Sequence, residues 1–253
     1  MTNRWASRRQ SLFRGRAARP FAGSPSAELR RSADHLAARE QPFVILDARP
    51  RVGDAWRNRW DSLRLFTPAR YCGLDGMPFP APPHYFPTKD EMADYLESYA
   101  ATFRLPVRTG TRVEALRKKN GHFVVETPDE RFESANVVIA MSNWQRPRRP
   151  ELAAGLDSEI RQIHSNDYRN PDQLRSGPVL VVGAGNSGAE IALDVVDGNH
   201  TWLSGPDTGH IPFRVESQVG RMVVPIVLRI VFPRVLTTST PMGRRARPKS
   251  GEG

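Results

Sequence analysis

The chain has 253 residues, of which 39% are hydrophobic and 22 are proline, so it is long enough for one large or two modest domains with a hydrophobic core. Its single cysteine, Cys72, excludes a disulfide framework, a cysteine-based zinc site and a Cys-x-x-Cys redox pair, and makes a reducing, cytoplasmic location the expectation. The net charge of +10 lies at the ends, +7 in residues 1–31 and +3 in residues 244–253, which argues against a nucleic-acid-binding face.

Both ends of the chain are predicted to lack regular structure. Residues 1–31 hold eight arginines and no apolar run that would form a secretory signal. We expect residues 1–32 to be an irregular or disordered basic segment, and residues 244–253 to be a solvated basic tail. Met222–Leu236 is strongly apolar, but its 15 residues include two prolines and two arginines, so it is too short to span a bilayer and is predicted to be buried or docked on the surface.

The middle of the chain alternates strands and helices. Phe43–Asp47 is a short apolar strand ending in a carboxylate, and Lys89–Phe103 has helical spacing of its apolar residues behind a Thr88/Glu91 capping box. Val107–Leu116 and His122–Thr127 are predicted to form a hairpin through an Asn-Gly turn. Val137–Ala140 is predicted as a buried strand in the same parallel sheet as Phe43–Asp47, with Asp47 facing a cofactor crevice.

A glycine-rich segment is the most informative part of the sequence. The apolar strand Val179–Val182 leads into a Gly-x-Gly-x-x-Gly loop and then a helix, which is the context that distinguishes a dinucleotide-binding fingerprint from a chance glycine pattern. Gly183 permits the turn, Gly185 lets the backbone approach a pyrophosphate, and Gly188 lets the helix pack closely on the strand. The helix N-terminus supplies amide donors to the phosphates.

Several further motifs accompany this loop. They are Gly53-Asp-Ala-Trp56-Arg57, Trp60-Asp-Ser-Leu-Arg-Leu-Phe-Thr-Pro68, Met77-Pro-Phe-Pro80, Tyr85-Phe-Pro-Thr88, His164-x-x-x-Tyr168 and Gly209-His-Ile-Pro-Phe-Arg214. With them, residues 33–249 resemble the flavin-containing monooxygenase family, in particular its bacterial flavoprotein members. The resemblance implies an α/β fold with two doubly wound Rossmann-like domains, the NAD(P) domain being inserted into the FAD domain. It predicts a partial FAD-binding domain over 33–150 and an NAD(P)-binding domain over 151–243.

The resemblance also implies an activity. In that family NADPH reduces FAD, and one oxygen atom of molecular oxygen passes to a small organic substrate. The cofactor carries the chemistry, so no catalytic side chain and no metal ligand is predicted. By the same resemblance Asp47 would bond the FAD ribose, Gly53, Trp56 and Arg57 would lie along the flavin, and the backbone near Val113 would read the adenine. The pyrophosphate of the nicotinamide cofactor would be held by Gly183, Gly185, Asn186, Ser187 and Gly188.

The sequence departs from the family pattern at both ends. No Gly-x-Gly-x-x-Gly loop precedes Asp47, and the simplest interpretation is that the first ~30 residues derive from a shifted reading frame or wrong start, so that the flavin site is incomplete.

Single positions also depart from the family pattern. Phe66 occupies a place where many members of the family have an Asn. Pro206 stands where an Arg often holds the NADP 2′-phosphate, which leaves the choice between NADPH and NADH open, with Arg214 as a substitute contact. His164 is expected to orient a loop rather than to transfer a proton.

Two functional readings therefore stay open. The first is an FAD- and NADPH-dependent monooxygenase-type oxidoreductase, whose turnover in this exact chain the sequence does not decide. The second is a non-catalytic NAD(P)-binding module without flavin. A disulfide reductase of similar fold is disfavoured because the cysteine has no partner in the sequence.

Overall fold

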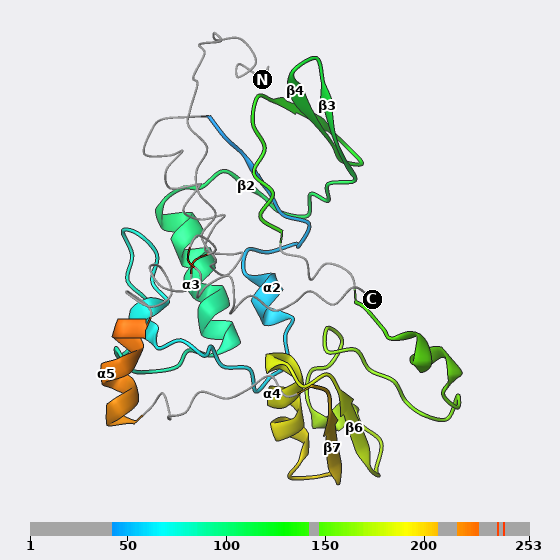
Figure 1. Cartoon of the computed structure of the whole chain (residues 1–253). Coiled ribbons are helices and arrows are strands. Elements are labelled where there is room, and N and C mark those ends of the chain that lie inside the picture. The colour runs from blue at the N-terminus through cyan, green and yellow to red at the C-terminus, as the bar shows by residue number, and fades with distance from the viewer. Residues whose placement is uncertain (1–41, 142–146, 207–216, 228–236, 238–239, 241–253) are drawn as a thin grey trace.

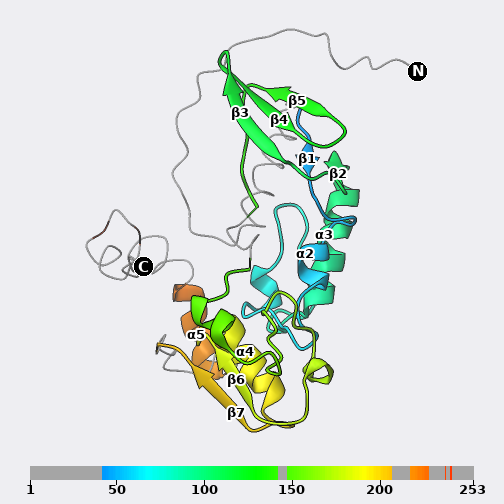
Figure 2. The same ribbon diagram turned by 90° about the vertical axis from the view of Figure 1, so that its right-hand side faces the viewer.

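The computed structural model describes residues 42–141, 147–206 and 217–227, together with Thr237 and Thr240. A three-stranded antiparallel sheet lies at one end of the molecule and a strand–helix–strand unit at the other, with helices α2 and α3 between them (Figures 1 and 2). The predicted α/β class is confirmed, and each parallel sheet in the described part has two strands. The predictions for residues 1–32, for residues 244–253 and for Arg214 lie outside the described residues.

The first parallel pair brings together segments on either side of α3. Strand β1 (Ile45–Leu46) pairs with β2 (Val107–Arg108), and α2 (Asp54–Arg57) and α3 (Lys89–Thr102) lie between them in the chain. Helix α3 begins as predicted, because the Thr88 side chain accepts a hydrogen bond from the Glu91 amide and the Glu91 carboxylate accepts one from the Thr88 amide. The capping box therefore sets the start of the helix that contributes Met92, Tyr95, Leu96 and Tyr99 to the core.

The predicted placement of residues 137–140 in the same parallel sheet as β1 is wrong. Residues 137–140 form no strand, and Val138 and Ile139 are exposed, whereas β1 takes its hydrogen bonds from the chain that returns after α3. The Ile45 amide donates to the Pro106 carbonyl and the Asp47 amide to the Arg108 carbonyl, both at 3.0 Å. The chain turns at Gly110, whose φ is 66°, so the strand predicted over Val107–Leu116 is divided between β2 and the later strand that begins at Ala115.

The antiparallel sheet contains the predicted hairpin and one strand that the sequence pattern did not indicate. β3 (Ala115–Lys119) pairs with β4 (His122–Glu126), and Asn120 and Gly121 between them both have positive φ, as a type I′ turn requires. β5 (Arg131–Ser134) adds to the other edge of β4. Its alternation of charged and aromatic residues is short, which is why it was missed.

The second parallel pair is the predicted glycine-loop unit. β6 (Val179–Val182) is followed by α4 (Asn186–Val195) and β7 (Thr201–Ser204), and β6 pairs with β7 in the register Val179↔Thr201. α5 (Gln218–Ile226) contains the start of the apolar run predicted to be buried or docked. Short 3₁₀ turns occupy Ala69–Tyr71, Glu151–Gly155 and Pro171–Gln173.

One hydrophobic core connects the two parallel units. Trp60 and Leu63 after α2, and Tyr95 and Tyr99 on α3, pack in the same buried cluster as residues of the glycine-loop unit. The latter are Tyr168, Ile191 and Val195. The helix α4 is therefore held from behind by the same core that packs against α3.

Candidate functional site

The glycine loop has the strand, turn and helix geometry of a dinucleotide-binding site. Gly183 follows β6 with a φ of 110°, a backbone conformation that L residues with a side chain rarely adopt. Its amide donates to the Ser204 carbonyl at 2.7 Å, so the loop is attached to the end of the neighbouring strand β7. Gly183, Gly185 and Asn186 are exposed to solvent. The loop is therefore positioned by the sheet and open on its outer side.

Two glycines fit where a side chain would collide with backbone. A Cβ on Gly188 would lie 1.7 Å from the Gly183 carbonyl oxygen, and a Cβ on Gly205 would lie 2.5 Å from the Ala184 nitrogen. Around Gly185, in contrast, nothing lies within 4 Å of a Cβ position. Gly188 thus serves helix packing, as the sequence predicted, whereas Gly185 borders open space. Gly205 was missed, although a glycine directly after the strand β7 was its visible signal.

The first turn of α4 provides donors for an anion. The first hydrogen bond of this turn runs from the Ala189 amide to the Gly185 carbonyl at 2.9 Å, so the amides of Asn186, Ser187 and Gly188 precede it. The helix has no side-chain N-cap and no acidic residue in its first turn. Partial positive charge at this end is therefore not neutralised by the helix itself, which suits a pyrophosphate.

The back of α4 is fixed by a buried tyrosine. The Tyr168 hydroxyl donates to the Asp194 carboxylate at 2.7 Å, and the Tyr168 side chain is 3% exposed. Burial and this carboxylate raise the pKa of Tyr168 well above its ordinary value. His164, four residues earlier, accepts the Asn166 amide on Nδ1 at 3.0 Å, which matches the expected loop-orienting role.

Replacing Tyr168 by phenylalanine should lower the free energy of unfolding by about 1–2 kcal/mol near neutral pH, because Asp194 loses its donor. Since the folded-state pKa of Tyr168 is raised above 10.0, the stability due to its neutral hydroxyl is present below pH 10 and is lost as the pH rises further. The difference between parent and variant should therefore shrink above pH 10. Urea unfolding of both proteins across this range measures it, and a constant difference would contradict the assignment.

A second contact of the same segment joins it to the α2–α3 region. The Asp61 amide donates to the Arg169 carbonyl at 2.7 Å, and the Asn170 side-chain amide donates to the Asp61 carboxylate at 2.8 Å. The other oxygen of that carboxylate lies 3.6 Å from Nζ of Lys89, which is 6% exposed. No sequence pattern indicated this network, because its members are far apart in the chain.

The residues predicted for a flavin occupy one region but have structural contacts of their own. Asp47 follows β1, is half-buried, and its Oδ1 accepts the Arg49 amide at 2.9 Å. Gly53 has a φ of 91°, and a Cβ there would lie 2.6 Å from the Ala93 carbonyl oxygen of α3. Trp56 packs against the core, and Val113 is exposed. The flavin contacts of these residues stay a prediction.

Arg57 connects α2 to α3. Its guanidinium donates to the Val52 carbonyl at 2.7 Å and forms ion pairs with three carboxylates, at 3.3, 2.7 and 3.0 Å. These carboxylates belong to Asp54, Asp94 and Glu97. The Arg57 side chain is 17% exposed, so its charge is largely used in packing the two helices. The position of Arg57 along a flavin stays a prediction.

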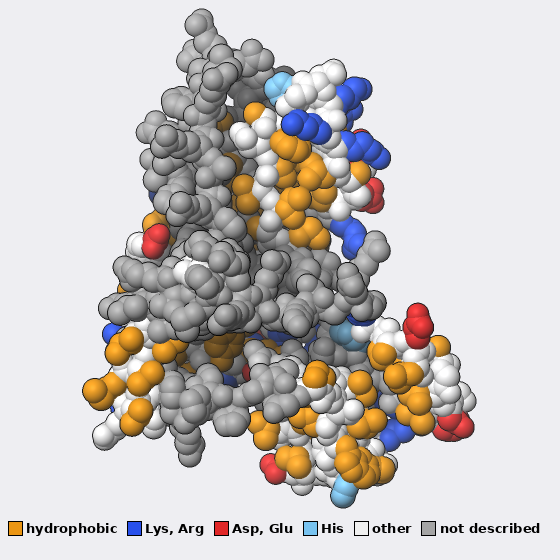
Figure 3. Space-filling model, viewed as in Figure 1, with side chains coloured by type: hydrophobic (Ala, Val, Ile, Leu, Met, Phe, Trp, Pro, Cys, Tyr) orange, Lys and Arg blue, Asp and Glu red, His pale blue; other side chains and the backbone are white. Residues whose placement is uncertain are grey.

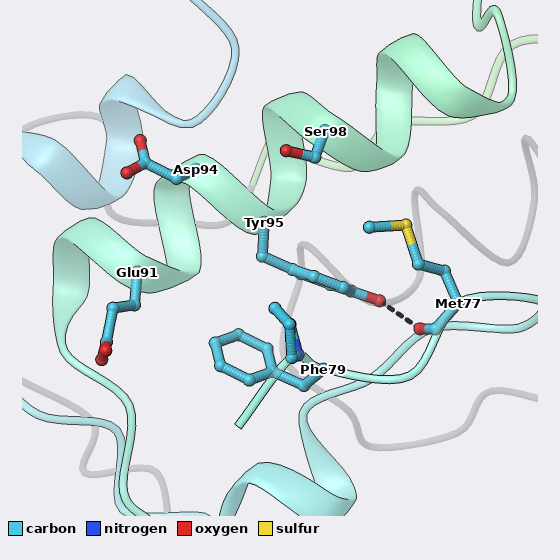
Figure 4. A pocket seen from close by; sticks show the side chains of 7 residues that line it. Met77, Phe79, Glu91, Asp94, Tyr95 and Ser98 are labelled. Carbon is cyan, nitrogen blue, oxygen red and sulfur yellow. Dashed lines mark hydrogen bonds between the residues drawn. The ribbon is translucent and has the colours of Figure 1, made fainter. Parts of the chain in front are cut away.

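A surface pocket of about 220 Å³ opens beside α3, and none of the predicted cofactor residues lines it (Figure 4). Tyr95 crosses it and donates its hydroxyl to the Met77 carbonyl at 2.7 Å. The acidic groups at its rim are already bonded, Glu91 to the Thr88 cap and Asp94 to Arg57. The rest of the lining is formed by Phe79, Pro80 and Ser98. These groups hold the loop on the helix and offer no uncommitted charge.

The described part of the chain provides neither a metal site nor a reactive cysteine. No group of three or more His, Cys, Asp or Glu side chains there is placed to hold a metal ion. Cys72 is buried, and its thiol contacts the Thr67 carbonyl at 3.3 Å. Burial raises the pKa of this thiol, which makes it a poor nucleophile at neutral pH.

No helix of the described ranges is long and apolar enough to cross a membrane.

Comparison with known proteins agrees with the geometry of the glycine loop. The model of the pyridine nucleotide-disulphide oxidoreductase family matches residues 32–206. The chain belongs to this family. An uncharacterized CzcO-like oxidoreductase of Geobacillus kaustophilus (strain HTA426) is 45% identical over 162 residues, which are 64% of this chain and 47% of that protein. Cys72 is the one cysteine among the 253 residues of this chain.

Solved structures of flavin monooxygenases are similar to this chain in fold. A flavin-containing monooxygenase from Stenotrophomonas maltophilia is 31% identical with a TM-score of 0.61, and the match covers 68% of this chain and 53% of that one. A crystal structure of OTEMO with FAD and NADP shares the fold at 19% identity and a TM-score of 0.56, over 83% of this chain and 44% of that one. The predicted resemblance to flavin monooxygenases is confirmed. The chain spans about half the length of the relatives it matches.

Proposed function

We propose that this chain carries the nicotinamide-dinucleotide site of an FAD- and NADPH-dependent monooxygenase-type oxidoreductase, which uses molecular oxygen and a small organic substrate. The observation that carries the proposal is the β6–α4–β7 unit. In it, a Cβ on Gly188 or on Gly205 would lie 1.7 or 2.5 Å from a backbone atom, so glycine is required at both positions. Gly185 borders open space at the helix N-terminus. A loop of this shape has little use in packing alone, because its outer side is exposed.

The chain's own residues bind and orient the dinucleotide. The amides of Asn186, Ser187 and Gly188 would donate to the pyrophosphate, and Gly185 would let the phosphates approach the backbone. Arg214 is proposed as the contact for a 2′-phosphate, as the sequence predicts. When bound, FAD would supply the redox chemistry, and Asp47 at the carboxyl end of β1 would hold its ribose. The similarity of the chain to flavin-containing relatives supports the flavin part of the proposal.

Gly185→Val tests the nucleotide site. Because nothing lies within 4 Å of the Cβ position, the variant should fold like the parent. Its side chain would occupy the space where the phosphates approach, so the dissociation constant for NADPH should rise about 30-fold, or about 2 kcal/mol. Gly198→Val is the matched control, since Gly198 also borders open space but lies beyond the other end of α4. Calorimetric titration of NADPH measures all three proteins, and equal affinities would refute the site.

A second candidate function is an NAD(P)-binding module without flavin. It is favoured by one observation: the described residues contain one glycine-rich phosphate loop, residues 183–188. The visible absorption spectrum of the purified chain separates the two candidates. Flavin bands that persist through dialysis support the oxidoreductase. A colourless protein that binds NADPH, and whose Gly185→Val variant binds it more weakly than the parent and Gly198→Val do, supports the module.

A further inference from the structure

Three arginines lie close together beside α2. Arg49 precedes this helix in the chain and Arg59 follows it. Arg169 is brought beside Arg59 because the Asp61 amide donates to the Arg169 carbonyl at 2.7 Å. Burial lowers the pKa of the Arg59 guanidinium, and the positive charges of Arg49 and Arg169 lower it further. The three residues therefore form a cationic cluster between α2 and the segment 164–170.

The acids near this cationic cluster have other partners. The Asp47 carboxylate accepts the Arg49 amide, and the Asp61 carboxylate binds Asn170 and lies 3.6 Å from Nζ of Lys89. Within residues 42–141, 147–206 and 217–227, none of the three guanidinium groups forms an ion pair with a carboxylate. The positive charge of the cluster is therefore not neutralised by the described residues.

The arginines of the antiparallel sheet are arranged differently. Lys and Arg side chains gather over this sheet in the space-filling view (Figure 3). There Arg117 pairs with Glu126, and Arg131 pairs with Glu133 at 2.9 Å. The cluster beside α2 has no such partners, although like charges repel and a partly buried cation loses hydration. This cost indicates a site that an anion completes.

The cluster has N–H groups left for an anion. Nε of Arg59 donates to the Ala55 carbonyl at 3.3 Å, and Nη1 of Arg169 donates to two carbonyls of its own turn at 2.9 and 2.8 Å. The described part of the chain offers no acceptor to the Nη atoms of Arg59, to Nη2 of Arg169 or to the Arg49 side chain. Arg59 and Arg169 are half-buried and Arg49 is exposed, so an anion can enter from solvent on the Arg49 side.

We infer that Arg49, Arg59 and Arg169 bind a phosphoryl dianion, either free phosphate or the phosphate group of a small ester. Two negative charges would offset the repulsion between the arginines, and a planar guanidinium binds phosphate oxygens in pairs. A bound anion would connect α2 to the segment 164–170, which carries the contact between the two parallel units. The inference does not depend on flavin or nicotinamide binding.

The cluster is distinct from the glycine loop. Tyr168, next to Arg169, bonds to Asp194 in the last turn of α4, whereas the glycine loop precedes the first turn of that helix. A phosphate at the arginines and a pyrophosphate at the loop would therefore occupy opposite ends of α4. Variants of the two places can be compared in one experiment.

Calorimetric titration with inorganic phosphate at constant ionic strength tests the inference. Arg59→Gln should raise the dissociation constant about tenfold or more, because charge-assisted hydrogen bonds are lost. Arg49→Gln should also raise it, and this variant should fold like the parent because Arg49 is exposed. Arg175→Gln is the matched control, since it removes an exposed arginine that donates to the Glu159 carbonyl at 2.8 Å. It should bind phosphate like the parent.

Four results would overturn the inference: no binding to the parent, equal affinities of the parent and both cluster variants, an equal loss in Arg175→Gln, or a loss in Gly185→Val alone. The third would leave only net charge, and the fourth would place the phosphate at the glycine loop and leave the proposed nucleotide site intact. Glycerol 3-phosphate identifies the source of the phosphoryl group. A lower dissociation constant than for inorganic phosphate indicates an ester, and an equal or higher one indicates free phosphate. Either supports the site when Arg59→Gln weakens it.

Discussion

Replacing Gly188 by alanine should lower the free energy of unfolding by about 3 kcal/mol, the upper range for an overpacked site. The new Cβ would lie 1.7 Å from the Gly183 carbonyl oxygen, a distance at which the backbone must move. Moving α4 away from β6 also displaces the amides of its first turn, so NADPH binding should fall together with stability. Urea unfolding and NADPH titration of the same preparation measure both effects.

The control for Gly188 lies in the same unit. Gly198 has no atom within 4 Å of its Cβ position, so Gly198→Ala should change the free energy of unfolding by no more than about 0.5 kcal/mol. Together with Gly185→Val, which should lose nucleotide affinity but not stability, the three variants separate packing from binding. A stable Gly188→Ala protein would show that α4 packs on its loop less closely than described.

Gly53→Ala should also lower the free energy of unfolding by about 3 kcal/mol, because two unfavourable effects add. The φ of 91° is unfavourable for any residue with a side chain, and the new Cβ would lie 2.6 Å from the Ala93 carbonyl oxygen. The contact lies inside α3, where the backbone cannot move without disturbing the core around Tyr95 and Tyr99. Thermal unfolding followed by circular dichroism measures the loss.

Gly110 provides the comparison for Gly53. Its φ of 66° is also positive, but nothing lies within 4 Å of its Cβ position. Gly110→Ala should therefore cost only the conformational strain, about 1 kcal/mol. If both variants lost the same stability, the close approach of α2 to α3 would contribute nothing, and the backbone conformation alone would account for the need for Gly53.

Local sequence signals predicted the elements whose geometry is decided within a few residues. The capping box fixed the start of α3, the Asn-Gly pair fixed the hairpin, and the glycine spacing behind Val179–Val182 fixed the β6–α4 turn. In each case the chemistry that specifies the structure lies inside a window of about ten residues.

Pairings between distant segments could not be predicted in the same way. Residues 137–140 were assigned to the sheet of β1 because they form a wholly apolar run, whereas 105–108 contains a proline and an arginine and pairs with β1 because of where α3 returns the chain. Two of the three carboxylates paired with Arg57 likewise lie on α3, 37 and 40 residues away in the chain. A motif locates such a residue but not its partners.

The same distinction between local signals and contacts of distant segments applies to the candidate site. The nucleotide loop was predicted residue by residue, whereas Gly205 and the Asp61–Asn170–Lys89 network were missed because they act across the chain. The flavin residues were identified by resemblance, and their contacts in the structure are with protein groups.

The segment from His164 to Asn170 has a consequence for modularity. Through Tyr168 it bonds to α4, and through Asn170 it bonds to Asp61 beside α2, so a single short stretch is shared by both parallel units. A boundary drawn at the proline-rich link near residue 150 would keep Tyr168 and Asp194 in one module but would separate Asn170 from Asp61. Chimeras that exchange nucleotide units between relatives would need to exchange Asp61 and Asp194 with this segment as a matched set.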